Sequence, residues 1–373
     1  MKLTKYIVSV FLCITLLSGL FLFFVSEKKE FSENENRLLE KLPEFSFDAL
    51  ESGNYLLKLE EYMKDHLPAR DTLMKIKTKA QIIAGFKKIN GVYIGDGRLM
   101  QKVEMPDGAI FIESTNRLFS KIDEDITTAV ILVPTASEIY KEALPDFSPC
   151  IDEKRVIDDI LAEIDCDIKP DLITAFNNAK DGGNLFYKTD HHWTAYGGTT
   201  AYRLYLELCG KDISDKAFDI TTVSENFKGT LYSKVLDDSL NDTIERYDVS
   251  GTSFKCESGN SPDTLKESDY FASEYLSKKD KYAYFGNENQ PLIVLENDKC
   301  ENDDEIVIIK DSFANCIAPL FTSDYKKVHI IDTRYMKKPK VSEYINFLPK
   351  VSDVLILYGL DSLNSNSGIS RIS

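Results

Sequence analysis

The chain opens with an apolar run, since no charged residue lies in Tyr6–Val25 and two lysines, Lys2 and Lys5, precede it. About 20 apolar residues are enough for a helix to cross a ~30 Å hydrocarbon core. Lysines on the N-terminal flank keep that end cytoplasmic. The pattern predicts an uncleaved anchor over residues 1–26, with the remainder exported. A cleaved signal peptide is the alternative, but the run is long for one and Phe23–Ser26 lacks a small-x-small site.

Residues 27–89 are predicted to form a juxtamembrane region. A charged segment, 27–44, reads as a stalk that ends near Pro43. From 47 to 86 the apolar residues recur at helical spacing, and Pro68 divides this run into two helices. His66 lies beside Asp65 at this break, where we interpret it as a structural hydrogen-bonding residue.

Beyond residue 90 the apolar pattern alternates between buried-type strands and amphipathic helices. Strands are predicted over 127–133, 305–309, 327–331 and 354–358, and helices near 138–143, 156–164, 194–208, 312–320 and 342–348. Such alternation favours a mainly parallel sheet with helices on both faces. We therefore predict one α/β domain over residues 90–361.

Two parts of this domain depart from the alternation. Residues 213–299 carry short β-type stretches, at 252–256, 282–285 and 292–295, separated by Asn, Gly, Ser and Asp. We interpret this region as a β-rich insertion within the domain. The Asn- and Ser-rich end, 362–373, is predicted to be a frayed tail.

Composition narrows the function classes. With 373 residues, 43% hydrophobic and 28% charged, the chain is typical of globular proteins. A formal net charge of −16 opposes nucleic-acid binding, which needs a basic footprint. The seven cysteines include no CxxC pair, which disfavours structural zinc. The six outside the anchor could pair after export, Cys150 with Cys166 for example, but buried free thiols are favoured.

The candidate chemistry centres on Phe186–Thr194, which holds two of the four histidines and the only tryptophan. Asp190 and His192 are two residues apart, so on an extended segment they project to one side. A carboxylate placed in this way can hold an imidazole in one tautomer, as in a nucleophilic triad. The serine of such a triad is predicted at Ser312, where the strand 305–309 runs into a helical pattern.

Each of these residues also has a plainer interpretation. Ser312 could be an ordinary helix N-cap, and Asp190–His192 could be a turn with a buried imidazole. A metal site is a third possibility, because adjacent histidines and an aspartate can bind zinc. However, adjacent histidines on a strand diverge, and no third ligand stands at a suitable spacing. We therefore predict no metal and no cofactor.

The segment Thr189–Thr194 resembles the signature of the bacterial DHHW family. That family is similar to the alginate O-acetyltransferase accessory proteins, whose motif reads Thr-Asp-x-His-Trp, in a circularly permuted SGNH-hydrolase-like superfamily. Further segments match in order: Glu35–Arg37 with Pro43, Asp65–Asp71, Asn90–Gly95, Val133–Thr135, Lys310–Phe313 and Asp332–Tyr335. The resemblance thus covers nearly everything beyond the anchor and implies a three-layer SGNH-like fold.

Carried over by position, the resemblance implies that Asp190 and His192 are the Asp-x-His pair and that Ser312 is the nucleophile. Lys310 stands where a glycine often precedes Asp-Ser, a departure from the pattern. The supporting residues are predicted to be Asp311, His191, Trp193, Arg334 and Tyr335.

The oxyanion-hole residues are not evident from the sequence. Ser312 can supply one backbone N–H, and Arg334, Tyr335 and Gly359 are candidates for its neighbourhood. His191 occupies the variable position of the motif and is interpreted as structural.

The function that the resemblance implies is an anchored, extracytoplasmic O-acyltransferase, transferring acetyl groups to a cell-surface or secreted polysaccharide. Cytosolic acetyl-CoA cannot be the donor unless the acyl group is moved across the membrane, and the resemblance implies a membrane-bound O-acyltransferase as the partner that does this. The same triad would also suit a carbohydrate esterase. A non-catalytic polysaccharide-binding or assembly protein is the alternative from another class.

Overall fold

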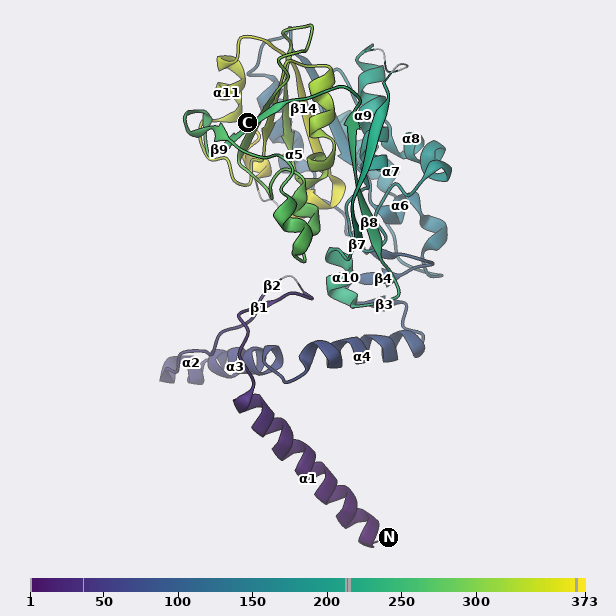
Figure 1. The fold of residues 1–373 in the computed structure, drawn as a ribbon, viewed down its shortest axis with the longest axis vertical. Coiled ribbons are helices and arrows are strands. Elements are labelled where there is room, and N and C mark those ends of the chain that lie inside the picture. Colours follow the sequence, from purple (N-terminus) through teal and green to yellow (C-terminus); the bar gives the residue numbers. More distant parts are fainter. Residues whose placement is uncertain (1, 36, 212, 214–215, 366–367) are drawn as a thin grey trace. The chain divides into compact units, whose positions relative to one another are not determined.

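The computed structural model describes residues 2–35, 37–211, 213, 216–365 and 368–373. Internal contacts divide the chain into two compact units (Figure 1). The first comprises residues 1–86 with 233–237, and the second comprises residues 87–232 with 238–373.

The first unit is mostly helical. Its elements are α1 (Lys2–Val25), β1 (Phe31–Ser32), β2 (Arg37–Leu38), α2 (Phe47–Glu51), α3 (Asn54–Asp65) and α4 (Arg70–Ile83). The part of α1 over Tyr6–Val25 is long and apolar enough to cross a membrane. Pro68 separates α3 from α4, as predicted, and Ala69 takes a left-handed backbone conformation with φ +54°.

Charged side chains tie the β1–β2 hairpin to the turn between α3 and α4. Arg37 donates to both carboxylate oxygens of Asp65, at 2.9 and 2.5 Å. Arg70 lies 2.7 Å from Glu35 and 3.6 Å from Asp65. The charged residues of the two segments that match the family, Glu35–Arg37 and Asp65–Asp71, therefore pair with one another and connect the hairpin to the helical turn.

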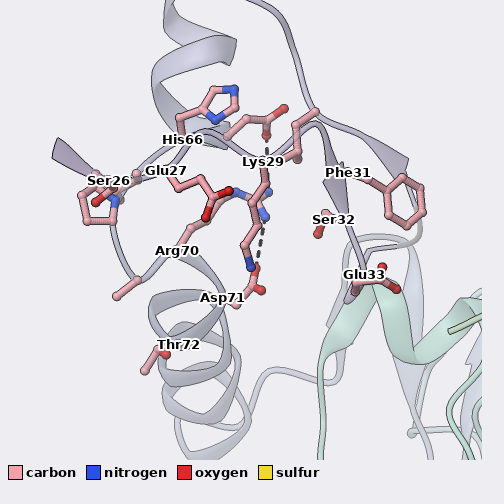
Figure 2. Close-up of a pocket in the computed structure, with 15 residues that line it drawn as sticks. Ser26, Glu27, Lys29, Phe31, Ser32, Glu33, His66, Arg70, Asp71 and Thr72 are labelled. Atoms are coloured by element: carbon pink, nitrogen blue, oxygen red, sulfur yellow. Dashed lines mark ion pairs between the residues drawn. The ribbon is translucent and has the colours of Figure 1, made fainter. Parts of the chain in front are cut away.

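A pocket of about 210 Å³ lies beside this network (Figure 2). Figure 2 marks ion pairs of Arg70, which lie at 3.6 Å to Asp65 and 3.7 Å to Asp71. His66 lines the pocket and its Nε2 donates to the Glu40 carbonyl at 3.0 Å. This contact agrees with the structural role predicted for His66.

The second unit is built on a seven-stranded mixed sheet, in the order β10-β9-β11-β13-β12-β14-β6. The strands β13, β12, β14 and β6 run parallel, and β11, β9 and β10 extend the sheet antiparallel. Their bounds are β6 (Thr127–Val133), β9 (Lys255–Gly259), β10 (Lys266–Glu267), β11 (Leu292–Glu296), β12 (Glu305–Lys310), β13 (Lys327–Ile331) and β14 (Val351–Gly359). Every residue of β12 is buried, which explains the continuous apolar run over Ile306–Ile309.

Helices and two small sheets complete this unit. The helices are α5 (Ala109–Phe119), α6 (Ala136–Ile139), α7 (Glu153–Ala162), α8 (Leu172–Ala179), α9 (Ala195–Leu208), α10 (Thr230–Val235), which continues into the first unit, and α11 (Val341–Phe347). One small sheet contains β3 (Lys88–Ile89), β4 (Val92–Ile94) and β5 (Leu99–Gln101), and the other contains β7 (Phe218–Phe227) and β8 (Asp242–Val249).

The region predicted to be an insertion contributes to the central sheet. Its strands β9 and β11 pair with each other, and β11 pairs with β13. The predicted strand at 282–285 is instead the 3-10 helix η5 (Lys281–Tyr284) and its C-cap. All four residues from Tyr282 to Phe285 are buried, whereas a strand on a half-exposed sheet would expose every second one.

Two further predictions are wrong in detail. The helix expected over 312–320 is a pair of 3-10 segments, η6 (Ser312–Cys316) and η7 (Ala318–Ser323). Pro319 lacks the N–H that a continuous α-helix would need there. The tail expected to fray forms η9 (Ile369–Arg371) near α5, with Ile369 and Ile372 buried.

A buried carboxylate lies where β6 meets α7. Glu153 is 2% exposed and accepts hydrogen bonds from the Oγ1 and N of Thr135, at 2.6 and 2.8 Å. Burial raises the pKa of Glu153 to about 7, against these hydrogen bonds, and the charge of nearby Glu138 acts in the same direction as burial. Glu153 is therefore protonated in much of the folded protein near neutral pH.

This raised pKa predicts a loss of stability with rising pH. Protonation of Glu153 favours the folded state fully below its ordinary pKa of 4.5, and the benefit disappears as the pH passes about 7. Glu153→Gln keeps a donor and an acceptor for Thr135 and removes the titration. Relative to this variant, the wild type should lose on the order of 3 kcal/mol between about pH 4.5 and 8. Thermal unfolding across this range tests it; a constant difference in Tm would contradict the assignment.

Candidate active site

Three side chains form a continuous hydrogen-bonded chain at the carboxyl ends of the parallel strands. Ser312 follows β12 by two residues, and His192 lies in the loop between α8 and α9. His192 Nδ1 lies 2.6 Å from Asp190 Oδ1, and His192 Nε2 lies 2.7 Å from Ser312 Oγ. Because a carboxylate only accepts, Nδ1–H donates to Asp190, and the lone pair of Nε2 faces the serine hydroxyl.

A turn, and not an extended strand, brings the side chains of Asp190 and His192 together. Both residues lie in bends, and the backbone N–H of His192 donates to Asp190 Oδ1 at 3.0 Å. This is the local side-chain-to-backbone bond, two residues on, that aspartate commonly makes. The predicted pairing is therefore present, but the expected extended geometry is wrong.

Thr189 fixes the position of this turn. Its N–H and Oγ1 both donate to Asp242 Oδ2, at 2.8 and 2.6 Å, and the N–H of Lys188 donates to Asp242 Oδ1 at 2.8 Å. Asp242 begins β8, so a residue about 50 positions later holds the backbone immediately before Asp190.

The outer oxygen of Asp190 is held by the start of α10. Oδ2 accepts from the N–H and the Oγ1–H of Thr230, at 2.7 and 3.1 Å. The preceding residue, Gly229, packs directly against this carboxylate. A Cβ built on Gly229 would lie 2.2 Å from Asp190 Oδ2 and 2.6 Å from its Cγ, so no other residue fits without displacing the carboxylate.

Asp311 holds the turn that presents Ser312. Its Oδ1 accepts from the N–H of Phe313 at 2.9 Å, and its Oδ2 accepts from the N–H of Gly359 at 2.7 Å and from Ser362 Oγ at 2.6 Å. The N–H of Gly359 is therefore occupied by a buried carboxylate. This removes Gly359 from the candidate oxyanion donors and gives it a positioning role.

Trp193 joins the two segments that carry the triad. Its indole Nε1 donates to the carbonyl of Phe313 at 2.8 Å, and its side chain is fully buried. One end of this bond is adjacent to His192 and the other is adjacent to Ser312. The tryptophan thus sets the separation of the imidazole and the hydroxyl.

His191 was expected to point away from His192, as adjacent residues on a strand do, but its ring lies against that of His192. Its ring centroid is 3.9 Å from that of His192. Its Nδ1 lies 2.7 Å from Thr230 Oγ1, and because Thr230 donates to Asp190, His191 is the donor in this contact. The turn explains the difference, since it does not send successive side chains to opposite sides as a strand does.

Burial and neighbouring charge set the protonation of the pair. Burial lowers the pKa of His192 to about 4, His191 acts in the same direction, and Asp190 opposes both. Burial alone would raise the pKa of Asp190, but the two histidines and Thr230 hold it well below its usual range. His192 is therefore neutral, and Asp190 ionised, at neutral pH. The ring of Tyr282 stacks on His192 at 4.0 Å between centroids, which fixes the imidazole plane.

Lys310, the residue that departs from the family motif, belongs to a buried cluster of charged and polar side chains. Lys310 is 1% exposed, and its Nζ lies 2.7 Å from Asn315 Oδ1 and 3.2 Å from Asp332 Oδ2. Arg334 donates to both oxygens of Asp332, at 2.9 and 2.6 Å, and lies over the ring of Tyr335. Arg334 and Tyr335 thus belong to this cluster after β13, and neither side chain bonds to Ser312.

A metal could be considered because ligand atoms of Asp190, His191 and His192 lie within 4.8 Å of one another. Hydrogen bonds engage these groups instead: His192 Nδ1 with Asp190, His192 Nε2 with Ser312, and His191 Nδ1 with Thr230. This arrangement suits proton transfer better than ligation. All seven cysteines are free thiols and none lies in this group.

Four residues of the site were not singled out from the sequence. Gly229, Thr230, Asp242 and Tyr282 all lie in the region interpreted as an insertion. Nothing in their spacing relates them to Asp190 or His192, because their contacts depend on how the chain returns after β7. A glycine followed by threonine at the start of a short helix is too common a pattern to indicate a site.

Comparisons with known proteins agree with this architecture. Residues 111–272 match a family model described as "SGNH hydrolase-like domain, acetyltransferase AlgX", a span that includes Asp190 and His192 and ends before Ser312. A DHHW family protein from Eubacterium siraeum matches with a TM-score of 0.65 and 21% identity, over 76% of this chain and 95% of that one. Bacillus cereus PatB1 with a sulfonyl adduct matches with a TM-score of 0.62 and 19% identity, over 76% and 98%.

A search of curated proteins gave no match. The family model and the shared fold confirm the resemblance that Thr189–Thr194 suggested. The chain therefore carries an SGNH hydrolase-like α/β domain, similar to the AlgX domain and to a DHHW family protein.

Proposed function

We propose that this protein is an extracytoplasmic O-acyltransferase, anchored by α1, that transfers acetyl groups to hydroxyls of a polysaccharide. The observation that carries the proposal is the unbroken chain from Asp190 through His192 to Ser312, with contacts of 2.6 and 2.7 Å. Both distances fall in the range over which proton transfer is direct. The description of the matched family model as an acetyltransferase supports the choice of group.

In the first half-reaction His192 Nε2 takes the proton of Ser312 as its Oγ attacks the acyl carbonyl. The donor's leaving group departs with that proton, and an acyl ester forms on Ser312. Asp190 keeps the imidazole in the required tautomer and stabilises the imidazolium that forms transiently. The low pKa of His192 ensures that the base is unprotonated before each cycle.

In the second half-reaction a sugar hydroxyl attacks the acyl ester, with His192 again as the base. The product is an O-acyl sugar, and Ser312 recovers its proton. Outside the cytoplasm the acyl group must arrive through the membrane, and the family resemblance implies a membrane-bound O-acyltransferase as the donor. Ser312 is partly exposed, which gives both donor and acceptor access to its oxygen.

Water in place of the sugar would make the same site an esterase. The distinction therefore depends on the acceptor. With a chromogenic acetyl ester as donor, adding oligosaccharides is expected to yield acetylated sugar at the expense of free acetate. Mass spectrometry of the sugar and an acetate assay measure the partition. If free acetate stays the only product whichever acceptor is added, the protein is an esterase and not a transferase.

The triad predicts how single and double variants behave. Ser312→Ala and His192→Ala should each reduce ester turnover to similar low levels, and the double variant should be little worse, because the groups act as a unit. Asp190→Asn should cost on the order of 10⁴-fold, as loss of a triad aspartate does in serine proteases. Steady-state kinetics on folded variants tests this.

Ser277→Ala, at an exposed serine, and His66→Ala, in the first unit, serve as matched controls and should keep full turnover. A Ser312→Ala variant with wild-type turnover would remove the acyl-enzyme from the mechanism. Wild-type turnover of the ester no higher than that of a protein-free blank would favour the non-catalytic binding role.

Gly229 offers a test of positioning without touching the triad itself. In Gly229→Ala the added methyl group must displace the Asp190 carboxylate, which a Cβ would approach within 2.2 Å. We expect turnover to fall by 10²-fold or more, on the order of the cost of a ~1 Å misplacement, with KM nearly unchanged. Gly19→Ala, at a glycine that has no neighbour within 4 Å of a Cβ and no positive φ, is the control for glycine loss. Equal turnover in both variants would show that the Gly229 contact has no functional role.

A further inference from the structure

The helix α4 carries an apolar face that the described protein leaves uncovered. Leu73, Ile76 and Ile83 are 47, 58 and 78% exposed, and Ala80 between them is also exposed. At about 100° per residue these four positions fall within an arc of about 80° on the helix surface. Three large aliphatic side chains on one exposed arc need a partner that removes them from water.

Two lysines border this arc symmetrically. Lys77 projects about 40° beyond Leu73, and Lys79 projects about 40° beyond Ile83 on the other side. Both are exposed. An apolar stripe with a lysine on each edge is the pattern of a helix that lies in a membrane interface, where the lysine stems follow the apolar surface and the ammonium groups reach the headgroups.

The arc also lies in the unit that contains the membrane-spanning candidate. The ring of Phe23, in the last turns of α1, contacts the ring of Tyr62 on α3 at 6.1 Å in an edge-to-face arrangement. This contact holds α3 at the end of α1 where the apolar run stops. α4 follows α3 after four residues, and its first residue, Arg70, is tied to Asp65 and Glu35. The helix pair therefore begins at the level where α1 leaves the hydrocarbon core.

We propose that α4 lies on the outer surface of the membrane, with Leu73, Ile76, Ala80 and Ile83 inserted among the lipids and Lys77 and Lys79 at anionic headgroups. The inference rests on α1 spanning the membrane, as the proposed function requires. A second attachment would restrict the orientation of the first unit on the bilayer, which the single helix α1 alone leaves free. Anionic phospholipid is the occupant that fits an apolar stripe with a positive charge on each edge.

Quenching of tryptophan fluorescence by brominated lipids tests this contact in the full chain. The one native tryptophan, Trp193, is fully buried and supplies a constant background. The probe variants are Ile76→Trp and Ile83→Trp, reconstituted alone in bilayers of phosphatidylcholine and phosphatidylglycerol. We expect strong quenching by lipids brominated near the headgroup end of the chain, and weaker quenching by lipids brominated near the terminal methyl.

Two control probes separate this inference from the anchoring on which it depends. Phe11→Trp in the middle of α1 should be quenched best by the deeply brominated lipid. Phe347→Trp at the end of α11 is a matched exposed apolar position, 81% exposed, and should not be quenched. Quenching at position 11 without quenching at 76 and 83 would overturn the α4 contact alone. Absence of quenching at position 11 would show that α1 does not span the bilayer, and it would overturn the α4 contact as well.

The charge reversal Lys77→Glu with Lys79→Glu tests the lysine edges. Each lysine lost at an anionic surface should lower the ratio of inserted to free α4 by about fivefold. Quenching at position 76 should fall in the anionic bilayer and change little in phosphatidylcholine alone. Equal quenching before and after the reversal would contradict the electrostatic part. Burial of the probe that depends on protein concentration and not on lipid would show that a second copy covers the face, which overturns the proposal.

Discussion

The constraint on which the site depends is the satisfaction of one buried carboxylate. Asp190 is 2% exposed, and an isolated charge there would be strongly unfavourable. Its oxygens accept four hydrogen bonds: from the N–H and Nδ1–H of His192, and from the N–H and Oγ1–H of Thr230. These donors keep the charge on Asp190 and aim the imidazole at Ser312. The fold around the site follows from the need to deliver donors from two distant segments to one carboxylate.

Further hydrogen bonds hold the backbone around Ser312 and join it to the segment that carries Asp190 and His192. Trp193 Nε1 donates to the Phe313 carbonyl, and the Asp311 carboxylate accepts from the N–H groups of Phe313 and Gly359. The histidine and the serine are therefore held by their neighbours as well as by their own contact. Such support is what keeps an active site within the narrow tolerance that catalysis requires.

The sequence was informative where local chemistry determines structure. The apolar strands β6, β12 and β13 could be located closely, because strands buried in a parallel sheet read as continuous apolar runs. The segments carrying Asp190, His192 and Ser312 could be found from residue type and from the family resemblance. The break at Pro68 followed from the missing N–H of proline.

The features of the site that could not be predicted from the sequence depend on tertiary contacts. Tyr282, in a segment predicted to be a strand, lies in the 3-10 helix η5 with its ring stacked on His192. Gly229 and Thr230, which follow β7, lie against Asp190. Lys310, which replaces the glycine that often precedes Asp-Ser in the family motif, is buried beside Asp332 and Asn315. No periodicity relates such residues, because they are far apart in the chain and meet only once it has folded.

In the proposed function, Ser312 carries the acyl group between donor and acceptor. The most direct measurement is tandem mass spectrometry of the full chain, quenched in acid during turnover of an acetyl ester and digested. We predict one acetyl group, located on Ser312, that disappears when an oligosaccharide acceptor is added before quenching. An acetyl group found only on other residues, or one on Ser312 that neither acceptor nor water removes, would contradict it.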